Sequence, residues 1–291
     1  MAEHNRLVQS LFVPALPLRA SDSHKGCFGS VAIVGGDKGM VGAVLLAARA
    51  AMFCGAGRVH AVFLAQDAPS IDLQHPEIML RSSATFNQLK QLNSIVVGPG
   101  LGQSASATAL LTLCLSHPSP ILIDADGLNL ISQHPHLTAI LQQRKAQTVI
   151  TPHPAEAARL LHTTVEDIQN NRTKSALALA DRYQAICVLK GAGTICADTD
   201  GTWFLNTTGN PGLATGGTGD VLSGVIGSLI AQGLTAIDAA KLGVYVHGAA
   251  ADALVESGIG PVGLTASEVA KEARNQINLL NGLAQKKPIQ T

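Results

Sequence analysis

The chain has 291 residues, of which 46% are hydrophobic and 14% charged, and its 20 basic and 20 acidic side chains cancel to a net charge of zero. This balance and the low aromatic content of 3% argue against a nucleic-acid surface or a membrane-binding patch. The five cysteines are scattered and form no CxxC pair, which is typical of small core residues in a reducing compartment. The N-terminus does not resemble a signal peptide, and the apolar run 221–234 is too short to cross a bilayer. We therefore expect a soluble, cytoplasmic protein.

Strands and helices are predicted to alternate along the chain. After an irregular lead-in over residues 1–24, the apolar segment Ser30–Gly36 predicts a buried strand, and the small residues of Gly42–Cys54 predict a helix. Further strands are expected at 58–64 and 94–98 and at the start of PILIDADGLNLI, TVITPHPAEAARLL and AICVLKG. Helices are expected at 104–116, 165–183, 218–232, 236–257 and 265–280, and a hairpin at 200–201. The pattern predicts an α/β fold, a central and mainly parallel sheet with helices on both faces, in a single domain over residues 1–291.

A glycine-rich loop, Gly216–Asp220, opens directly into an apolar helical run. Glycines allow the backbone to approach a ligand closely, and the N-terminus of a helix attracts anions. Asp220 places a negative charge where an anion site would disfavour one. We expect it to abstract a proton from, or to orient, a hydroxyl group that faces a phosphoryl group. The alternative is a tight turn in which Asp220 only caps the helix.

Other polar motifs follow the predicted strands, and parallel sheets bind ligands at the carboxyl ends of their strands. His153 is held between two prolines, and Glu156 is placed to cap a helix or to reach a hydrated magnesium ion. Lys190 stands beside glycines, which suits contact with a phosphate group. Asp124 and Asp126 are candidates for metal binding or for helix capping.

Two familiar nucleotide motifs are absent. The segment Gly35–Ala43 does not have the spacing GxGxxG, and the chain contains no GxxxxGK[ST]. The glycine loops at 35–43 and 98–102 remain either walls of a ligand site or simple turns. Taken together, the loops, the lysine and the GTGD segment predict phosphoryl transfer or the binding of a nucleotide diphosphate.

Seven segments in order resemble the ADP-dependent NAD(P)H-hydrate dehydratase family of the ribokinase-like superfamily: KGCFGSVAIVGG, GAVLLAARAAMFCGAGRV, VVGPGLG, LIDADGLNLI, TPHPAEAARLL, VLKGAGT and NTTGNPGLATGGTGDVLSGVIGSLIAQG. The resemblance covers roughly residues 25–280. It implies a metabolite-repair lyase that returns the S epimer of hydrated NADH or NADPH (NADHX, NADPHX) to NAD(P)H at the expense of ADP. The ring hydroxyl would be phosphorylated and phosphate then eliminated.

The resemblance also implies roles for single residues. Asp220 would be the catalytic base, and Asn210 would also face the site. The residues expected to line the hydrated cofactor are Ala43, Gly102, His153 and Asp220. Those expected to contact the adenine nucleotide are Lys190, Gly191, Ala192, Gly193, Thr194 and Gly219. Glu156 would approach Mg2+ through water.

The family pattern further implies a homo-oligomer, a tetramer by resemblance, that binds neither nucleic acid nor membrane. Only about 25 residues precede the matching region, so we expect no fused epimerase and possible cooperation with a separate one. Two other functions stay open. One is a small-molecule kinase of the same superfamily, acting on a vitamin-precursor alcohol, and the other is a non-catalytic nucleotide sensor. The segments GPGLG, DADGLN and TPHPAE favour the dehydratase over the kinase.

Overall fold

The computed structural model describes residues 5–17 and 19–285. Nine strands form one sheet in the order β3-β2-β1-β4-β5-β6-β7-β8-β9. Pairing is parallel from β3 to β7, whereas β7–β8 and β8–β9 are antiparallel. The strands are β1 (Ser30–Gly35), β2 (Arg58–Phe63), β3 (Met79–Ser82), β4 (Ser94–Val97), β5 (Ile121–Ile123), β6 (Thr148–Ile150), β7 (Ile186–Leu189), β8 (Thr194–Ala197) and β9 (Trp203–Asn206).

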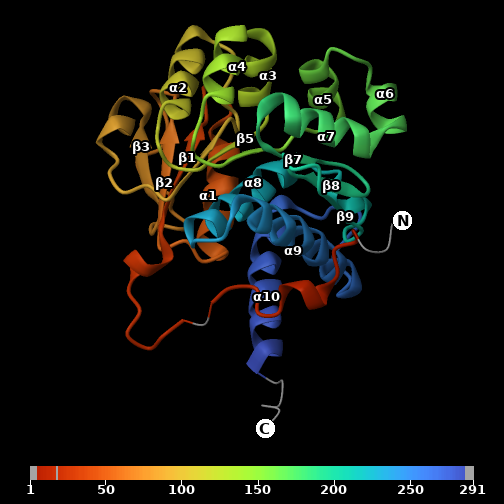
Figure 1. The fold of residues 1–291 in the computed structure, drawn as a ribbon. Coiled ribbons are helices and arrows are strands. Elements are labelled where there is room, and N and C mark those ends of the chain that lie inside the picture. Colours follow the sequence, from red (N-terminus) through yellow and green to blue (C-terminus); the bar gives the residue numbers. More distant parts are fainter. Residues whose placement is uncertain (1–4, 18, 286–291) are drawn as a thin grey trace.

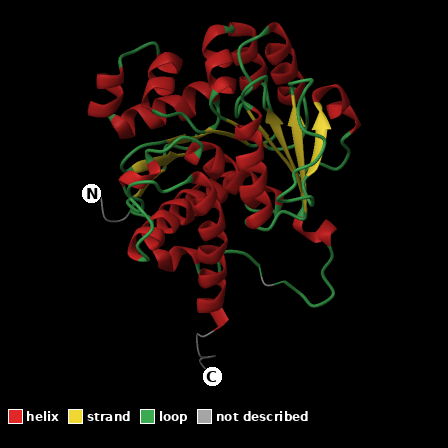
Figure 2. Ribbon diagram, turned by 180° about the vertical axis from the view of Figure 1, so that it is seen from behind, coloured by secondary structure: helices red, strands yellow, loops and turns green. Residues whose placement is uncertain are grey.

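Helices cover both faces of the sheet (Figures 1 and 2). One face carries α1 (Val41–Phe53), α8 (Thr218–Ala231), α9 (Ala236–Glu256) and α10 (Ala266–Gln285). The other carries α2 (Ala105–Leu115), α3 (Asp126–Gln133), α4 (Pro135–Gln142), α5 (Pro154–Leu161), α6 (Val165–Asn170) and α7 (Arg172–Tyr183). The predicted α/β architecture, mainly parallel and covered on both faces, is confirmed.

The core consists of two apolar layers, one on each side of the sheet. In β1, Val31 and Ile33 pack into the layer beneath α1, α8, α9 and α10, and Ala32 and Val34 into the opposite layer. Successive side chains of a strand point to opposite faces, so a strand buried on both sides must be apolar throughout. This explains why SVAIVG carries no charged residue.

Two expectations from the sequence need correction. The helix predicted over 165–183 is wrong as one element, because Asn171 leaves the helical region at φ −133° and separates α6 from α7. The Asn171 side chain donates to the carbonyl of Asp167, a local bond of the kind by which asparagine competes with a continuous helix. Strand β3 was not expected from the sequence. Its partly exposed sequence MLRS lies at an edge of the sheet and lacks the apolar pattern of the inner strands.

Helix α8 lies close to its neighbours because it carries small residues. A Cβ on Gly224 would lie 2.0 Å from the carbonyl oxygen of Ala47 in α1, so only glycine allows this approach. A Cβ on Gly227 would lie 2.3 Å from a methyl group of Val96 in β4. The glycines therefore seat α8 between α1 and the sheet, with its N-terminus near the carboxyl ends of the strands.

The lead-in packs onto the domain where it is described. Arg6 forms a bridge with Leu205 beside β9, and Leu7 and Phe12 are buried. Four of the five cysteines are buried, Cys27 is exposed, and none forms a disulfide. In the described part of the chain, no helix is both long and apolar enough to span a membrane.

Candidate active site

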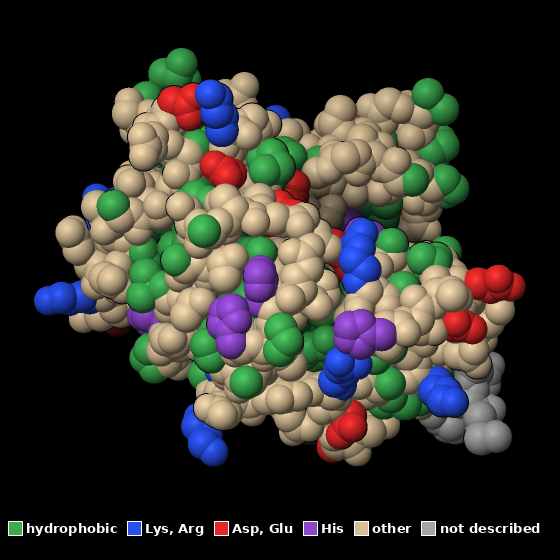
Figure 3. Space-filling view, turned by 90° about the horizontal axis from the view of Figure 1, so that it is seen from above, with side chains coloured by type: hydrophobic (Ala, Val, Ile, Leu, Met, Phe, Trp, Pro, Cys, Tyr) green, Lys and Arg blue, Asp and Glu red, His purple; other side chains and the backbone are tan. Residues whose placement is uncertain are grey.

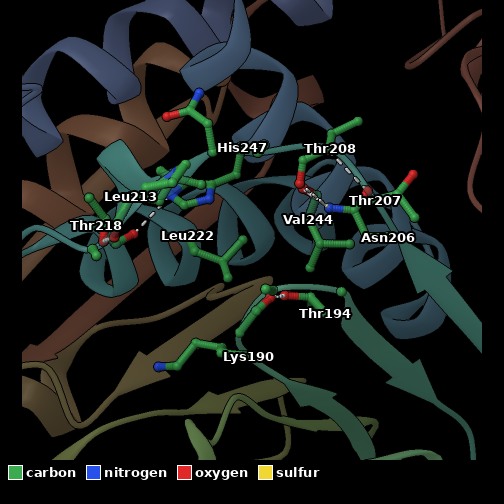
Figure 4. A pocket seen from close by; sticks show the side chains of 18 of the residues that line it. Lys190, Thr194, Asn206, Thr207, Thr208, Leu213, Thr218, Leu222, Val244 and His247 are labelled. Atoms are coloured by element: carbon green, nitrogen blue, oxygen red, sulfur yellow. Dashed lines mark hydrogen bonds between the residues drawn. The ribbon is translucent and has the colours of Figure 1, made fainter. Parts of the chain in front are cut away.

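A cavity of about 570 Å³ lies beside the antiparallel end of the sheet (Figure 4). Its walls come from the loop after β7, the segment 206–214 after β9, the first turn of α8 and the middle of α9. In Figure 4, Lys190 and Thr194 lie on one side and Thr208 and His247 on the other. The lining includes all six residues predicted to contact the nucleotide: Lys190, Gly191, Ala192, Gly193, Thr194 and Gly219. Its size falls within the range of small-molecule sites.

Lys190 forms a buried ion pair at the inner end of this cavity. Its Nζ donates to Asp124 Oδ1 at 2.7 Å, and the Ser223 hydroxyl donates to Asp124 Oδ2, also at 2.7 Å. The Asp124 side chain is 1% exposed, so both of its oxygens are satisfied within the protein. Burial alone would lower the pKa of Lys190, but the carboxylates of Asp124, Glu156 and Asp220 outweigh it and raise that pKa. The ammonium group therefore stays charged.

Asp220 lies in the first turn of α8, next to Gly219 of the cavity wall. The N-cap of α8 is Gly217 at φ 88°, and no side-chain hydrogen bond caps the helix there. A Cβ on Gly219 would lie 3.4 Å from Lys190 Nζ, which brings this turn close to the ammonium group. Burial raises the pKa of Asp220 to about 7; the charges of Asp124 and Asp126 add to this effect and Lys190 opposes it. A carboxylate with this pKa suits a general base near neutral pH.

His153 and Glu156 form the N-terminal cap of α5. The backbone N–H groups of Ala155 and Glu156 donate to His153 Nδ1 at 3.1 and 3.4 Å, and the His153 N–H donates to Glu156 Oε2 at 2.8 Å. His153 Nε2 lies 3.2 Å from Glu156 Oε1. Burial and the charges of Lys190 and Arg159 lower the pKa of His153, so the imidazole is neutral near pH 7. The half-exposed neutral ring of His153 can then contact a ligand or form a hydrogen bond with it.

Ala43, in the first turn of α1, and Gly102, in the loop after β4, lie near the carboxyl ends of β1 and β4. The Asp37 N–H donates to the Gly100 carbonyl at 2.7 Å, and a Cβ on Gly100 would lie 3.3 Å from that of Ala43. The Gly102 N–H donates to Asp126 Oδ2 at 2.8 Å. The cavity lining does not include Ala43, Gly102, His153 or Asp220. The charge of Lys190, which does line the cavity, acts on His153 and Asp220, and Asp126 joins Gly102 to the surroundings of Asp220.

The strands point toward the top of Figure 2, and Figure 3 looks onto that end. Acidic, basic and histidine side chains gather there in and around a hollow between two raised parts of the surface. This arrangement agrees with the binding of ligands at the carboxyl ends of parallel strands.

Sequence reasoning missed His247, which belongs to the cavity lining. His247 of α9 is buried, and its Nε2 lies 3.0 Å from the Thr218 carbonyl at the start of α8. Burial lowers the pKa of His247 to about 4, so the neutral ring donates to that carbonyl and fixes the turn. Asn210, which the resemblance had placed at the site, lines the cavity, but both ends of its amide are engaged, Nδ2 with Asp252 and Oδ1 with the Gly212 N–H. A lone histidine within a long helix carries no sequence signal.

The carboxylates of Glu156 and Asp124 do not fit direct binding of a metal ion. Among residues 5–17 and 19–285, no group of three or more His, Cys, Asp or Glu side chains could hold one. Both oxygens of Glu156 are engaged with His153, and both oxygens of Asp124 with Lys190 and Ser223. A magnesium ion at this site would depend on phosphate oxygens for most of its ligands.

The sheet topology and this site define an α/β protein of the ribokinase-like class. A ribokinase-like superfamily protein from Enterococcus faecalis superposes with a TM-score of 0.83 at 26% identity, over 95% of this chain and 96% of that one. The family model for NAD(P)H-hydrate dehydratase matches residues 31–275. The chain belongs to the NAD(P)H-hydrate dehydratase family, as the sequence motifs predict.

Relatives agree with this assignment. An ADP-dependent (S)-NAD(P)H-hydrate dehydratase from Neisseria meningitidis is 45% identical over 88% of this chain and 87% of its own length. A bifunctional NAD(P)H-hydrate repair enzyme from Coxiella burnetii is 41% identical over 91% of this chain, which spans only 54% of that relative. The ADP/ATP-dependent NAD(P)H-hydrate dehydratase from Bacillus subtilis, co-crystallised with ATP/Mg2+, has a TM-score of 0.83 at 30% identity, covering 95% of this chain and 98% of that one.

Proposed function

We propose that this protein dehydrates the S epimer of hydrated NADH or NADPH, with ADP as the phosphoryl donor. The observation that carries the proposal is the position of Asp220. Its neighbour Gly219 lines the cavity proposed for the nucleotide, and the same helical turn approaches Lys190. Asp220 therefore lies at the border between a nucleotide site and the polar hollow proposed for the hydrated cofactor. Family membership supports the same substrates.

In the proposed first step, the hydroxyl oxygen of the hydrated ring attacks the terminal phosphorus of ADP and AMP leaves. Asp220 accepts the hydroxyl proton, for which a pKa of about 7 is suited. Lys190 and the free N–H groups at the start of α8 stabilise the negative charge of the group in transfer.

In the proposed second step, the ring nitrogen expels phosphate from the neighbouring carbon, and loss of a ring proton restores the dihydropyridine. The products are NAD(P)H, AMP and phosphate, so the overall reaction removes water and splits ADP. Phosphorylation is needed because hydroxide is a poor leaving group and phosphate a good one. His153, the first turn of α1 at Ala43 and the loop of Gly102 are proposed to hold the ring. Glu156 is proposed to act on magnesium only through water, because both of its oxygens are engaged with His153.

The test is to mix the protein with S-hydrated NADH, magnesium and either ADP or ATP, and to follow the absorbance of the dihydronicotinamide together with the release of AMP or ADP. Recovery of absorbance that matches nucleotide consumption is expected, and the nucleotide that supports it identifies the donor. In Asp220→Asn, turnover should fall by at least about 100-fold, while the Kd for ADP changes by less than about 3-fold.

A matched control is Asp181→Asn, which neutralises an exposed aspartate on α7. Its turnover should equal that of the wild type. Near-normal turnover in Asp220→Asn would remove Asp220 from the mechanism. No recovery with either nucleotide would refute the dehydratase, and consumption of nucleotide with a simple alcohol instead would establish a kinase.

We also propose that the protein is a homotetramer and that a separate epimerase supplies the S epimer. The tetramer is proposed from the family resemblance, and Leu73 and Val262, 87% and 94% exposed, are apolar side chains that remain available for contacts between copies. Light scattering measures the mass directly, and a monomer would refute the tetramer. With a mixture of both epimers, only the S fraction should react until an epimerase is added.

A further inference from the structure

Arg172, the first residue of α7, lies behind the Lys190–Thr194 loop of the cavity. Its Nη2 atom is 3.1 Å from the carbonyl oxygen of Leu189, 3.2 Å from that of Lys190 and 3.1 Å from that of Gly193. Its Nη1 donates to the side chain of Gln169 at 2.9 Å. One guanidinium group thus gathers three carbonyl groups of a single loop.

These bonds determine the direction of the loop's peptide groups. In a planar trans peptide, the C=O of one residue and the N–H of the next point in opposite directions. The Leu189–Lys190 peptide illustrates this, because its carbonyl faces Arg172 while its N–H donates to Pro152 at 2.9 Å. The Lys190 carbonyl also faces Arg172, so the N–H of Gly191 points away from the guanidinium.

The Gly191 carbonyl is also engaged, since the Thr194 hydroxyl donates to it at 3.0 Å. By contrast, the N–H groups of Gly191, Ala192 and Gly193 find no acceptor within residues 5–17 and 19–285. All three residues line the cavity. Four carbonyls of this segment are thus engaged, and among the described residues only that of Ala192 has no donor. Three free N–H groups remain, which is the arrangement that an anion requires.

The charge of Arg172 acts in the same direction. No ion pair of the described residues involves it, so its positive charge is balanced by carbonyl dipoles alone. The side chain is half-buried, and a Cβ on Gly191 would lie 3.1 Å from Nη1, so the cation lies directly against the loop. A cation partly removed from solvent favours a negative ligand on the other side of the loop.

We propose that Arg172 is a positioning residue that shapes the Lys190–Thr194 loop into a receptor for the phosphate groups of a nucleotide diphosphate. The inference rests on the nucleotide site of the proposed function. It assigns Arg172 no contact with the ligand: the guanidinium turns the carbonyls away from the phosphates and leaves the N–H groups and Lys190 to bind them.

The test compares the Kd values of ADP, AMP and adenosine by calorimetry for the wild type, Arg172→Met and Arg172→Lys. In Arg172→Met, ADP binding should weaken by about 10- to 100-fold and adenosine binding by less than about 3-fold. Arg172→Lys keeps the charge but loses the planar fork, so its ADP affinity should be intermediate. The control is Arg182→Met, an exposed arginine on the same helix, with ADP affinity equal to the wild type.

The dependence on phosphate separates this role from a merely structural one. Equal weakening of ADP and adenosine would overturn the proposal, because it would mean that the whole cavity had been damaged. Unchanged ADP affinity in a folded Arg172→Met would overturn it as well. If Arg172→Met fails to fold, Arg172→Lys still tests the proposal. Wild-type ADP affinity in Arg172→Lys would show that the planar guanidinium group is not needed to shape the loop, and would refute the proposal. A wild-type protein that does not bind ADP would refute the proposed function itself, together with this inference.

Discussion

Replacing Asp220 by asparagine should stabilise the ligand-free protein more strongly at pH 8 than at pH 5. The pKa of this carboxyl rises from 3.8 to about 7 on folding, because burial and two neighbouring carboxylates disfavour its charged form. Between these two values the native state binds a proton that the unfolded state has lost. Stability is therefore highest at low pH and falls as the pH rises through this window.

The magnitude follows from the two pKa values. Integrating the proton linkage shows by how much the raised pKa of Asp220 lowers the free energy of unfolding. The loss is about 1.7 kcal/mol at pH 5 and about 4 kcal/mol at pH 8. Asparagine does not ionise and so avoids this loss. The free energy of unfolding of Asp220→Asn, relative to that of the wild type, should therefore increase by about 2.5 kcal/mol from pH 5 to pH 8. For 291 residues the unfolding entropy is about 0.6 kcal/mol/K, which converts this change to roughly 4 °C in Tm.

The assay is thermal unfolding of both proteins without ligand at pH 5, 6, 7 and 8, followed by circular dichroism. His247 titrates in this range only in the unfolded state, because its pKa falls from 6.5 to about 4 on folding; both proteins contain it, so its effect cancels in the difference. Asp181→Asn, on the exposed side of α7, should show a difference that does not vary with pH. A constant difference for Asp220→Asn, or one that shrinks toward pH 8, would refute the electrostatic account of this site.

Three further predictions concern the same elements. The kcat/KM of the proposed reaction should rise with pH and level off above about 7, because only ionised Asp220 accepts a proton; rates measured from pH 5 to 9 test this. Lys190→Met should weaken ADP binding by more than about 10-fold and lower the free energy of unfolding by about 3 kcal/mol, because it leaves the Asp124 carboxylate buried without its cation; calorimetry and urea unfolding measure the two effects. Gly224→Ala should cost about 3 kcal/mol in urea unfolding, because its Cβ would lie 2.0 Å from the Ala47 carbonyl.

Each prediction has a result that would contradict it. A pH profile that is flat from 5 to 9 would exclude proton acceptance by Asp220 as a controlling step. Lys241→Met, which breaks a more exposed pair with Asp238, should cost less than about 1 kcal/mol, and an equal cost for Lys190→Met would contradict the buried ion pair. Gly282→Ala in α10 is the control for Gly224→Ala, since its Cβ meets no atom of the described part of the chain within 4 Å and alanine favours helices. Equal stability of the two glycine variants would contradict the close packing of α8.

The alternation of buried strands and helices was readable from the sequence because it depends on neighbouring residues. The run Ser30–Gly35 is apolar at every position that can face a layer of helices, so it predicts an inner strand. Gly217 and Asp220 likewise mark the start of α8, where a glycine turn leads into an apolar run. Local pattern failed at Asn171, where one polar residue divides a stretch that otherwise favours helix.

The partners of the site were not readable in this way. Asp124 and Lys190 are 66 positions apart, and Arg172 reaches carbonyl groups as far as Gly193, 21 positions along the chain. A carbonyl group occurs at every residue, so its capture by an arginine leaves no mark in the sequence. His247 gave no signal for the same reason, because it acts on the backbone of Thr218.

The sequence by itself determined the layered α/β fold, the family and the glycine loops at the ends of the strands, since these follow from hydrophobic period, turn chemistry and motif order. Only the tertiary structure decided that the charged Lys190 is paired with Asp124 and that the Glu156 carboxylate is engaged by His153. It also decided that one cavity is lined by segments from β7 to α9. The physical reason is that charge, burial and hydrogen bonding at a site depend on distances in space. These distances are set by how the helices pack on the sheet, which no local pattern of residues records.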